Sequence, residues 1–256
     1  MVNEFYKIGK ASVYITSYDD VIARILSFIQ EHRKGYVCVS NMRTIAVANR
    51  NDKYLRVMEN SLLNIPDGTP LIWCAKLWGI TQAKRVCGPM LFEKMLYVEG
   101  LRHFLLGDTH NVLEKIKDKI MGVSGIKIVG YCSPPFAPIE TYNIKAMADV
   151  INESGANIVW TSLKAPKQDY LNSMLLPFLR DDIILIGVGA AFRVFIGDIK
   201  VENGLLSHIG LGGFKMIRKE SSFYKEIIWY LKHSVYLSKY MLFILYDRMR
   251  GKNYWE

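Results

Sequence analysis

Residues 36–65 read YVCVSNMRTIAVANRNDKYLRVMENSLLNI, and they contain the pattern that decides the fold. Apolar runs at 36–40 and 62–65 enclose two segments, 44–50 and 52–61, whose apolar residues recur with the period of a helix. Both runs are apolar throughout instead of alternating with polar residues, which indicates strands that are covered on both faces. A strand, a helical connection and a second such strand predict a right-handed crossover in a parallel sheet.

The same alternation continues to about residue 200. Further helices are predicted at 19–32, 71–78, 89–98, 109–121, 141–153 and 168–178, and further strands at 103–107, 127–130, 157–161 and 183–188. We therefore expect a doubly wound α/β fold, with a largely parallel sheet and helices on both faces. Ligands of such sheets bind beyond the carboxyl ends of the strands, so the loops after the apolar runs are the places to search for a site.

The alternation of strands and helices stops after Ile199, which predicts a core of residues 1–200 and a C-terminal appendage of residues 201–256. Segment 222–250 has the pattern of one or two amphipathic helices rich in Tyr, with Lys225, Lys232 and Lys239 seven residues apart. An apolar aromatic face beside a Lys stripe is typical of a helix that lies on a membrane surface. The alternative is a helix that packs on the core or on a second subunit of a homo-oligomer.

The formal net charge of +9 favours an anionic partner, such as nucleic acid, a membrane or a phosphorylated substrate. Residues 210–256 carry +5 of this charge and the other 209 residues carry only +4, so the basic character belongs mainly to the appendage. Helix-turn-helix, zinc-finger and RNP motifs are all lacking, and we expect no nucleic-acid partner. The first 20 residues lack an apolar signal region, and the four cysteines match no disulfide framework, which predicts a cytoplasmic protein.

Two polar residues follow the strands predicted in the opening segment and its continuation. Asp67 comes directly after 62–65, in the sequence NIPDGTP, where a carboxylate is able to act as a general base. An Asp-Gly pair is also favoured in turns, so a purely structural role stays open. Asn41 follows 36–40, where its side chain is suited to bind a ligand or to cap the next helix. The two residues are expected to face one crevice.

Two further strand ends carry candidate groups for a phosphorylated ligand. After 157–161, Lys167 is suited to a phosphate and Gln168 to a sugar, although the same residues are ordinary at the start of a helix. After 183–188, the sequence GVGAAF lets the backbone approach a pyrophosphate closely, but this short glycine pair alone is a weak signal.

A metal site is not expected. The chain has no DxD motif, the five histidines form no HxH or HxxxH pair, and the adjacent Asp181 and Asp182 are interpreted as solvated residues. Diphosphate charge would then be met by basic side chains such as Arg85 and Lys167, and by backbone N–H groups.

In series, several of these segments resemble the WecG/TagA/CpsF family of bacterial glycosyltransferases. They occur in family order over about residues 36–197 and read VSNMRTIAVANR, IPDGTPLIWCAKLWG, RVCGP, GYCSPPF, INESGANIVW, APKQD and IGVGAAF. The resemblance implies a Rossmann-like α/β fold and an inverting, metal-independent transferase that needs no cofactor. It also implies a UDP-sugar donor, an undecaprenyl-diphosphate-linked acceptor, and an appendage that docks on the inner face of the cell membrane.

The resemblance also implies roles for particular residues. Asp67 matches the catalytic base, and residues 187–192 match the nucleotide-binding loop. The positions that match substrate-binding residues are Asn41, Arg85, Gln168, Gly187, Gly189, Ala190, Ala191, Phe192, Ser133 and Phe136. In the appendage, Arg218 is the candidate for a contact with the lipid diphosphate, with Lys215 and Lys219 as alternatives.

The chain departs from the family pattern at several positions. Arg193 stands where the family usually has an aspartate suited to the nucleoside, and Thr161-Ser162-Leu163-Lys164 replaces VGLG, so two glycines are lost. Met90, Val201-Glu202-Asn203 and Gly210-Leu211-Gly212-Gly213 replace the family's Asp, RAP and GLEW. These changes predict the same scaffold with an altered donor pocket. The alternative to an active transferase in polysaccharide assembly is a catalytically silent nucleotide-sugar-binding or scaffold relative.

Overall fold

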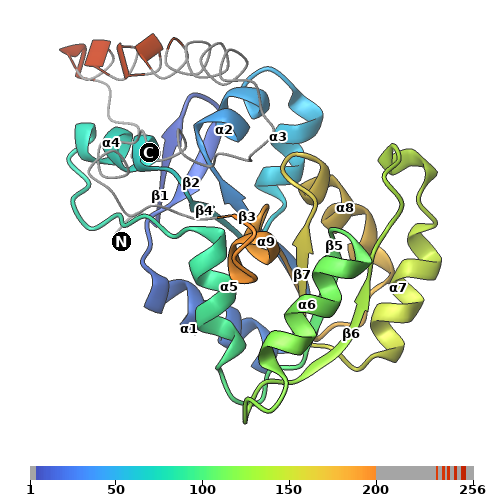
Figure 1. Cartoon of the computed structure of the whole chain (residues 1–256). Coiled ribbons are helices and arrows are strands. Elements are labelled where there is room, and N and C mark those ends of the chain that lie inside the picture. The colour runs from blue at the N-terminus through green and yellow to red at the C-terminus, as the bar shows by residue number, and fades with distance from the viewer. Residues whose placement is uncertain are drawn as a thin grey trace.

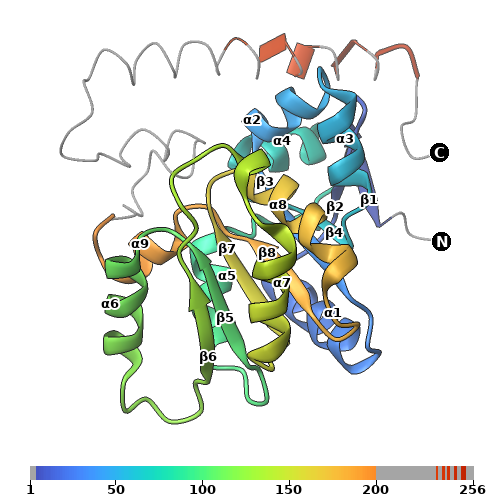
Figure 2. The same cartoon turned by 90° about the vertical axis from the view of Figure 1, so that its right-hand side faces the viewer.

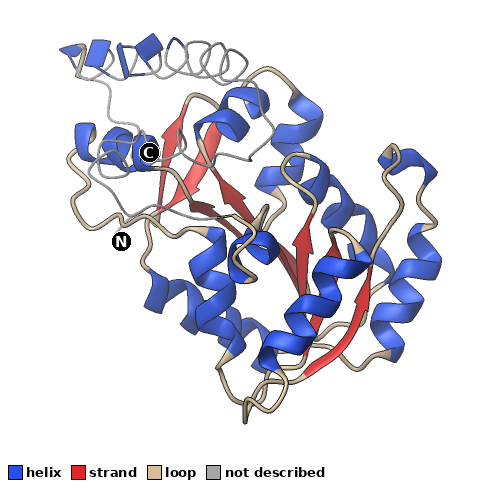
Figure 3. Ribbon diagram, in the orientation of Figure 1, coloured by secondary structure: helices blue, strands red, loops and turns tan. Residues whose placement is uncertain are grey.

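The computed structural model of the chain describes residues 4–199 together with residues 235, 238, 239, 241, 242, 245, 246 and 249–251. Its centre is a six-stranded sheet in the order β4-β3-β8-β7-β5-β6, in which all neighbouring strands are parallel (Figure 3). The strands are β3 (Gly35–Ser40), β4 (Leu63–Pro66), β5 (His103–Gly107), β6 (Ile128–Cys132), β7 (Ile158–Ser162) and β8 (Ile184–Gly187). The six predicted strands are thus confirmed, with ends that differ by at most two residues.

The helices that connect these strands were also predicted, apart from the last one. They are α1 (Tyr18–Gln30), α2 (Met42–Ala48), α3 (Asp52–Glu59), α4 (Thr69–Leu77), α5 (Gly88–Leu96), α6 (His110–Ile120), α7 (Ile144–Glu153), α8 (Lys167–Leu175) and α9 (Ala191–Phe195). The single helix predicted at 168–178 is wrong at its end, where Pro177 lies in a separate 3₁₀ turn, Leu176–Phe178. A second 3₁₀ turn, Ile139–Thr141, precedes α7.

The sequence analysis missed three short elements. An antiparallel hairpin of β1 (Phe5–Ile8) and β2 (Ala11–Tyr14) precedes α1, and its turn contains Gly9 with a φ of 64°. Each strand has only four residues and α9 has only five, which is too short for a periodic pattern to stand out.

Alternate residues of each central strand belong to two different cores. Val37 and Val39 of β3 pack with α1, α5, α6 and α9, whereas Tyr36 and Cys38 pack with α2, α3, α4, α7, α8 and the hairpin. Figures 1 and 2 show α6 on one side of the sheet and α7 on the other. The absence of alternation in the strand sequences is explained by this double cover, because each face needs its own apolar side chains.

The helices that follow β3, β7 and β8 lie on different faces of the sheet. The helices α2 and α8, which follow β3 and β7, pack on one face, whereas α9, which follows β8, packs on the other. Because β8 lies between β3 and β7, the loops at its carboxyl end leave the sheet in opposite directions. Such a divergence is where open α/β sheets form their ligand crevice.

Most of the predicted appendage, including Arg218, lies outside the described residues. The described residues from Val235 to Met249 are helical. In the part of the chain that the structure describes, no helix is both long and apolar enough to cross a membrane.

Candidate functional site

The carboxyl ends of β3 and β4 bring Asn41 and Asp67 together, as expected. The two strands are neighbours, and the backbone N–H of Asp67 donates to the carbonyl of Ser40 at 2.7 Å. Between them lies Gly68, where a Cβ atom would stand 3.6 Å from Cβ of Asn41. Asn41 and Asp67 therefore lie close together at the carboxyl edge of the sheet, and a crevice that binds a ligand between them stays a prediction.

Asp67 has the environment of a proton acceptor. Its side chain is only 28% exposed, and burial raises the pKa of its carboxyl group to about 7, against the opposing effect of Arg85. The Arg85 guanidinium lies 3.6 Å from Oδ1 of Asp67, and its Nε donates to the Asp67 carbonyl at 2.7 Å. A carboxyl group that titrates near neutral pH is matched to general-base work in a way that a simple turn residue is not.

Asn41 caps α2, so the capping role that the sequence left open is confirmed. Its Oδ1 accepts from the backbone N–H groups of Arg43 at 3.0 Å and Thr44 at 3.2 Å. Its amide nitrogen has no hydrogen-bond partner among the described residues. The side chain is exposed, so this N–H₂ group stays available to a ligand at the crevice while the oxygen holds the helix.

The loop after β8 is held from β7 and α8. The Gly189 N–H donates to Oε1 of Gln168 at 3.0 Å, and the Ser162 hydroxyl donates to the Gly189 carbonyl at 2.5 Å. Gly187 faces α8 so closely that a Cβ atom there would come within 2.7 Å of Nε2 of Gln168. Gln168 is buried, and its hydrogen bond to Gly189 holds the backbone of the 187–192 loop.

The other residues of that loop differ in what they expose. The side chains of Ala191 and Phe192 are fully buried in the core, Phe192 against Phe92. Any contact of these two residues with a ligand would therefore use the backbone. Ala190 precedes α9 and is half-buried at the surface.

The remaining predicted residues lie on the loops that follow β6 and β7. Lys167 donates to the Ala137 carbonyl at 2.6 Å and to the Tyr142 hydroxyl at 2.7 Å, so its ammonium group anchors the loop before α7. In that loop, Phe136 is fully exposed and the Ser133 hydroxyl donates to the Asp108 carbonyl at 2.7 Å. The ammonium group of Lys167 is therefore hydrogen-bonded within the protein. Its predicted contact with phosphate stays a prediction.

A charged pair that the sequence analysis missed lies beside this loop. Asp108 follows β5 with a φ of 57°, and its carboxylate accepts from Nη2 and Nε of Arg193 at 2.6 and 2.9 Å. Asp108 stands directly after an apolar run, as Asp67 does, so the rule that selected Asp67 also points to it. The pair ties α9 to the end of β5.

A second missed group lies under the crevice. Asp169 is buried, its Oδ2 accepts from the Tyr54 hydroxyl at 2.6 Å, and burial raises the pKa of its carboxyl group to about 7. Its Oδ1 and the hydroxyl of Ser40 are buried without hydrogen-bond partners in the described part of the chain. A carboxyl group next to Gln168 in sequence and buried among side chains of β3 and α3 can be found only from the tertiary structure.

The described residues contain no group of three or more His, Cys, Asp or Glu side chains that is placed to hold a metal ion. Asp182, which the sequence analysis had interpreted as solvated, instead pairs with Arg180 at 3.1 Å, and its side chain is 23% exposed. The interpretation is therefore wrong for Asp182, whereas it holds for Asp181, whose side chain is 77% exposed.

The sequence was compared with models of known protein families. A model described as the Glycosyl transferase WecG/TagA/CpsF family matches residues 6–216, which include every strand of the sheet and all the strand ends described above. The chain therefore belongs to the WecG/TagA/CpsF family of glycosyltransferases, which act in cell-surface polysaccharide synthesis.

Proposed function

We propose that this protein is an inverting, metal-independent glycosyltransferase that moves a sugar from a UDP-sugar to a polyprenyl-diphosphate-linked sugar acceptor. The observation that carries the proposal is Asp67, a carboxyl group with a pKa of about 7 at the carboxyl edge of the sheet, 3.6 Å from Arg85. The transferred group, a hexosyl or an N-acetylhexosaminyl residue, is part of the proposal.

In this mechanism the ionised Asp67 accepts the proton of an acceptor hydroxyl. The acceptor oxygen then attacks the anomeric carbon from the face opposite the leaving group, and the bond from that carbon to the UDP oxygen breaks. The charge that develops on UDP is met by nearby cations and by backbone N–H groups of residues 187–192. Because the nucleophile is the acceptor itself, one inversion occurs at the anomeric carbon and no covalent glycosyl-enzyme forms.

The polyprenyl acceptor implies work at a membrane surface. Val235, Leu242 and Met249 recur every seven residues and are 66%, 65% and 80% exposed. A stripe of exposed apolar side chains supports an appendage, residues 201–256, that docks on the inner face of the cytoplasmic membrane while residues 1–200 carry out the transfer. Removal of residues 222–256 should then release the protein from vesicles; a change in assembly instead would indicate that the appendage packs between subunits.

The first experiment is a UDP-release assay with a panel of UDP-sugars, a short-chain polyprenyl-diphosphate-sugar acceptor and EDTA. Acceptor-dependent release with one donor supports a metal-independent transferase and identifies that donor. Nucleotide binding without release from any donor contradicts the proposal and favours a catalytically silent nucleotide-sugar-binding relative. The Arg193 side chain, paired with Asp108 at the family's nucleoside position, is the observation that favours this second candidate.

A further inference from the structure

Two cations that the sequence analysis assigned to phosphate have partners within the protein. Arg85 lies 3.6 Å from Asp67, although its side chain is 41% exposed, and Lys167 donates to Ala137 and Tyr142. Arg193, at the family's nucleoside position, makes two bonds to Asp108. Further cations near the carboxyl end of β8 would strengthen the binding of a donor diphosphate, since charge-assisted bonds are the strong ones in phosphate recognition.

Two exposed cations follow β3 and β7, the two strands that lie on either side of β8. Arg43 lies in the first turn of α2, after β3, and its Nη2 is 3.5 Å from the carbonyl of Ala165. Lys164 is the residue before Ala165, on the loop after β7. Because β8 lies between β3 and β7, the contact between Arg43 and Ala165 reaches across the end of β8, where the 187–192 loop begins.

Both side chains keep most of their hydrogen-bonding capacity free. Apart from the long contact with Ala165, Arg43 makes no side-chain hydrogen bond or ion pair within the described part of the chain. Lys164 makes none with any described residue, and it is exposed. A guanidinium group has five N–H donors and an ammonium group has three, which together suit the oxygens of a diphosphate.

Lys164 also has an unfavourable backbone conformation. Its φ is 62°, in the left-handed region that glycine adopts readily and that a lysine adopts only at a conformational cost. Strain of this kind persists where the surrounding structure imposes it, and it concentrates at ligand-binding sites. A glycine would fit this backbone better, which makes Lys164→Gly a useful variant for testing the role of the ammonium group.

We propose that Arg43 and Lys164 bind the diphosphate of the nucleotide-sugar donor from the two sides of the β8 crevice. This inference rests on the proposed function, because it names the residues that hold the donor used in that reaction. It gives a role to two side chains that the sequence analysis did not name as substrate-binding residues.

The test compares the affinities of UDP and uridine for the full-length protein by calorimetry. Wild type is expected to bind UDP more tightly than uridine, and R43Q and K164Q each to lower the affinity for UDP by about tenfold with uridine unchanged. Lys127→Gln is the matched control, because Lys127 is an exposed cation without a described partner just before β6, at the opposite edge of the sheet. It should leave both affinities unchanged.

Lys164→Gly separates a binding role from a structural one. This variant removes the ammonium group and relieves the backbone strain, so we expect a melting temperature equal to or above that of wild type together with the same tenfold loss in UDP affinity, about as large as in K164Q. Unchanged UDP affinity in R43Q and in K164G would overturn the proposal. Equal losses for UDP and uridine would overturn it as well, because they would show a general change of the pocket.

The remaining outcomes distinguish the donor diphosphate from the acceptor diphosphate, and the diphosphate site from the proposed sugar transfer. If the variants raise the KM for the polyprenyl-diphosphate acceptor and leave UDP affinity unchanged, the pair binds the acceptor and the donor assignment is overturned. A wild type that binds neither UDP nor inorganic pyrophosphate also overturns it. If UDP binding depends on Arg43 and Lys164 but no donor gives acceptor-dependent UDP release, the proposed transfer fails while the diphosphate site stands.

Discussion

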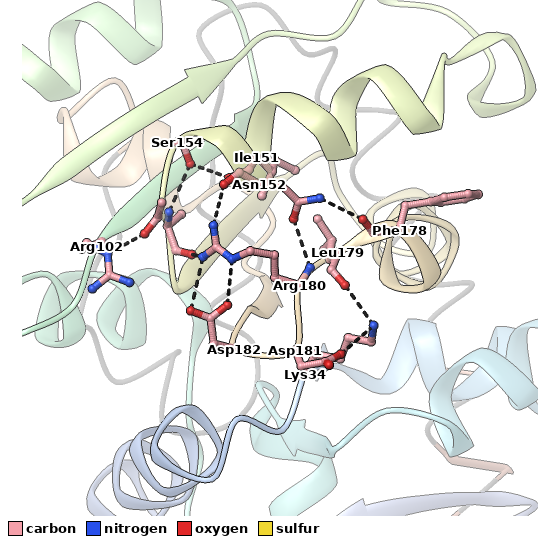
Figure 4. Close-up of polar contacts among 12 residues, drawn as sticks. Lys34, Arg102, Ile151, Asn152, Ser154, Phe178, Leu179, Arg180, Asp181 and Asp182 are labelled. Carbon is pink, nitrogen blue, oxygen red and sulfur yellow. Dashed lines mark hydrogen bonds and ion pairs between the residues drawn. The ribbon is translucent and has the colours of Figure 1, made fainter.

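The amino and carboxyl edges of the parallel sheet, where its strands begin and end, differ in how their polar groups are paired. At the amino edge, polar groups pair with one another around Arg180, which binds Asp182 at 3.1 Å and the Ala156 carbonyl at 3.0 Å (Figure 4). Asn152 accepts from the Arg180 N–H at 3.0 Å and donates to the Phe178 carbonyl at 2.9 Å. Lys34 joins Asp181 and the Leu179 carbonyl, each at 2.9 Å.

At the carboxyl edge, several polar groups are held in unfavourable states, although others, such as Arg193 with Asp108, are paired. Asp67 and Asp169 have carboxyl groups whose pKa burial raises to about 7. Asp108 and Lys164 have left-handed backbones, and the Ser40 hydroxyl is buried without a hydrogen-bond partner among the described residues. The difference teaches that the amino edge stabilises the fold, whereas groups at the carboxyl edge cost stability, as is expected of the proposed site.

The largest expected effect tests Asp67. Asp67→Asn should lower turnover about 100-fold or more while nucleotide binding stays, because the amide cannot accept the acceptor proton. Its melting temperature at pH 8 should not fall, since the variant removes a carboxylate that is unfavourable when buried. UDP release and thermal unfolding measure both quantities. Nearly unchanged turnover would contradict the assignment of Asp67 as the base.

The next effect tests the amino edge. Arg180→Ala should lower the free energy of unfolding by about 3 kcal/mol, because Asp182 and two carbonyl groups lose their partners together. Urea denaturation measures this change. The KM and kcat of the folded variant at low temperature should match wild type. A selective loss of turnover without loss of stability would break the division between the two edges.

A smaller effect distinguishes two glycines of the same loop. Gly187→Ala should lower stability by about 2 kcal/mol and weaken UDP binding, because its Cβ would come within 2.7 Å of Nε2 of Gln168. Gly189→Ala meets no atom within 4 Å and only has to adopt a φ of 63°, which costs about 1 kcal/mol. Calorimetry on both variants compares their losses of stability. A larger loss in Gly189→Ala would show that the Gln168 side chain moves readily to make room for a Cβ atom at residue 187.

The smallest expected effect is the pH dependence. With a pKa of about 7, Asp67 should let kcat rise roughly tenfold from pH 6 to pH 8 as the base ionises. The free energy of unfolding should show the opposite trend: the folded pKa of Asp67 lies above the usual 3.8, so stability is lost as the pH rises from about 4 to about 7. Asp67→Asn should remove the pH dependence of kcat and reduce that of stability, to which Asp169 also contributes because its pKa is raised to about 7 as well. A flat pH–rate profile in wild type would contradict the role of Asp67.

Much of the architecture followed from local patterns. Each central strand has two covered faces, so runs such as 103–107 are apolar at every position, and this signal does not depend on distant residues. The site was predictable where it used strand ends, because Asn41 and Asp67 each follow such a run directly. The hairpin at 5–14 was not predictable, because its short strands are stabilised by packing against α2, α3 and α4.

Sequence by itself determined the parallel sheet, the family and the sheet edge at which the proposed site lies, because strand and helix periodicity and motif order are properties of neighbouring residues. Only the tertiary structure decided which charges have partners within the protein. Lys167 was predicted to bind phosphate and Arg193 was a departure from the family pattern, yet their partners, Tyr142 and Asp108, lie 25 and 85 residues away. Whether a charge is available depends on such long-range contacts, and the order of the strands determines them.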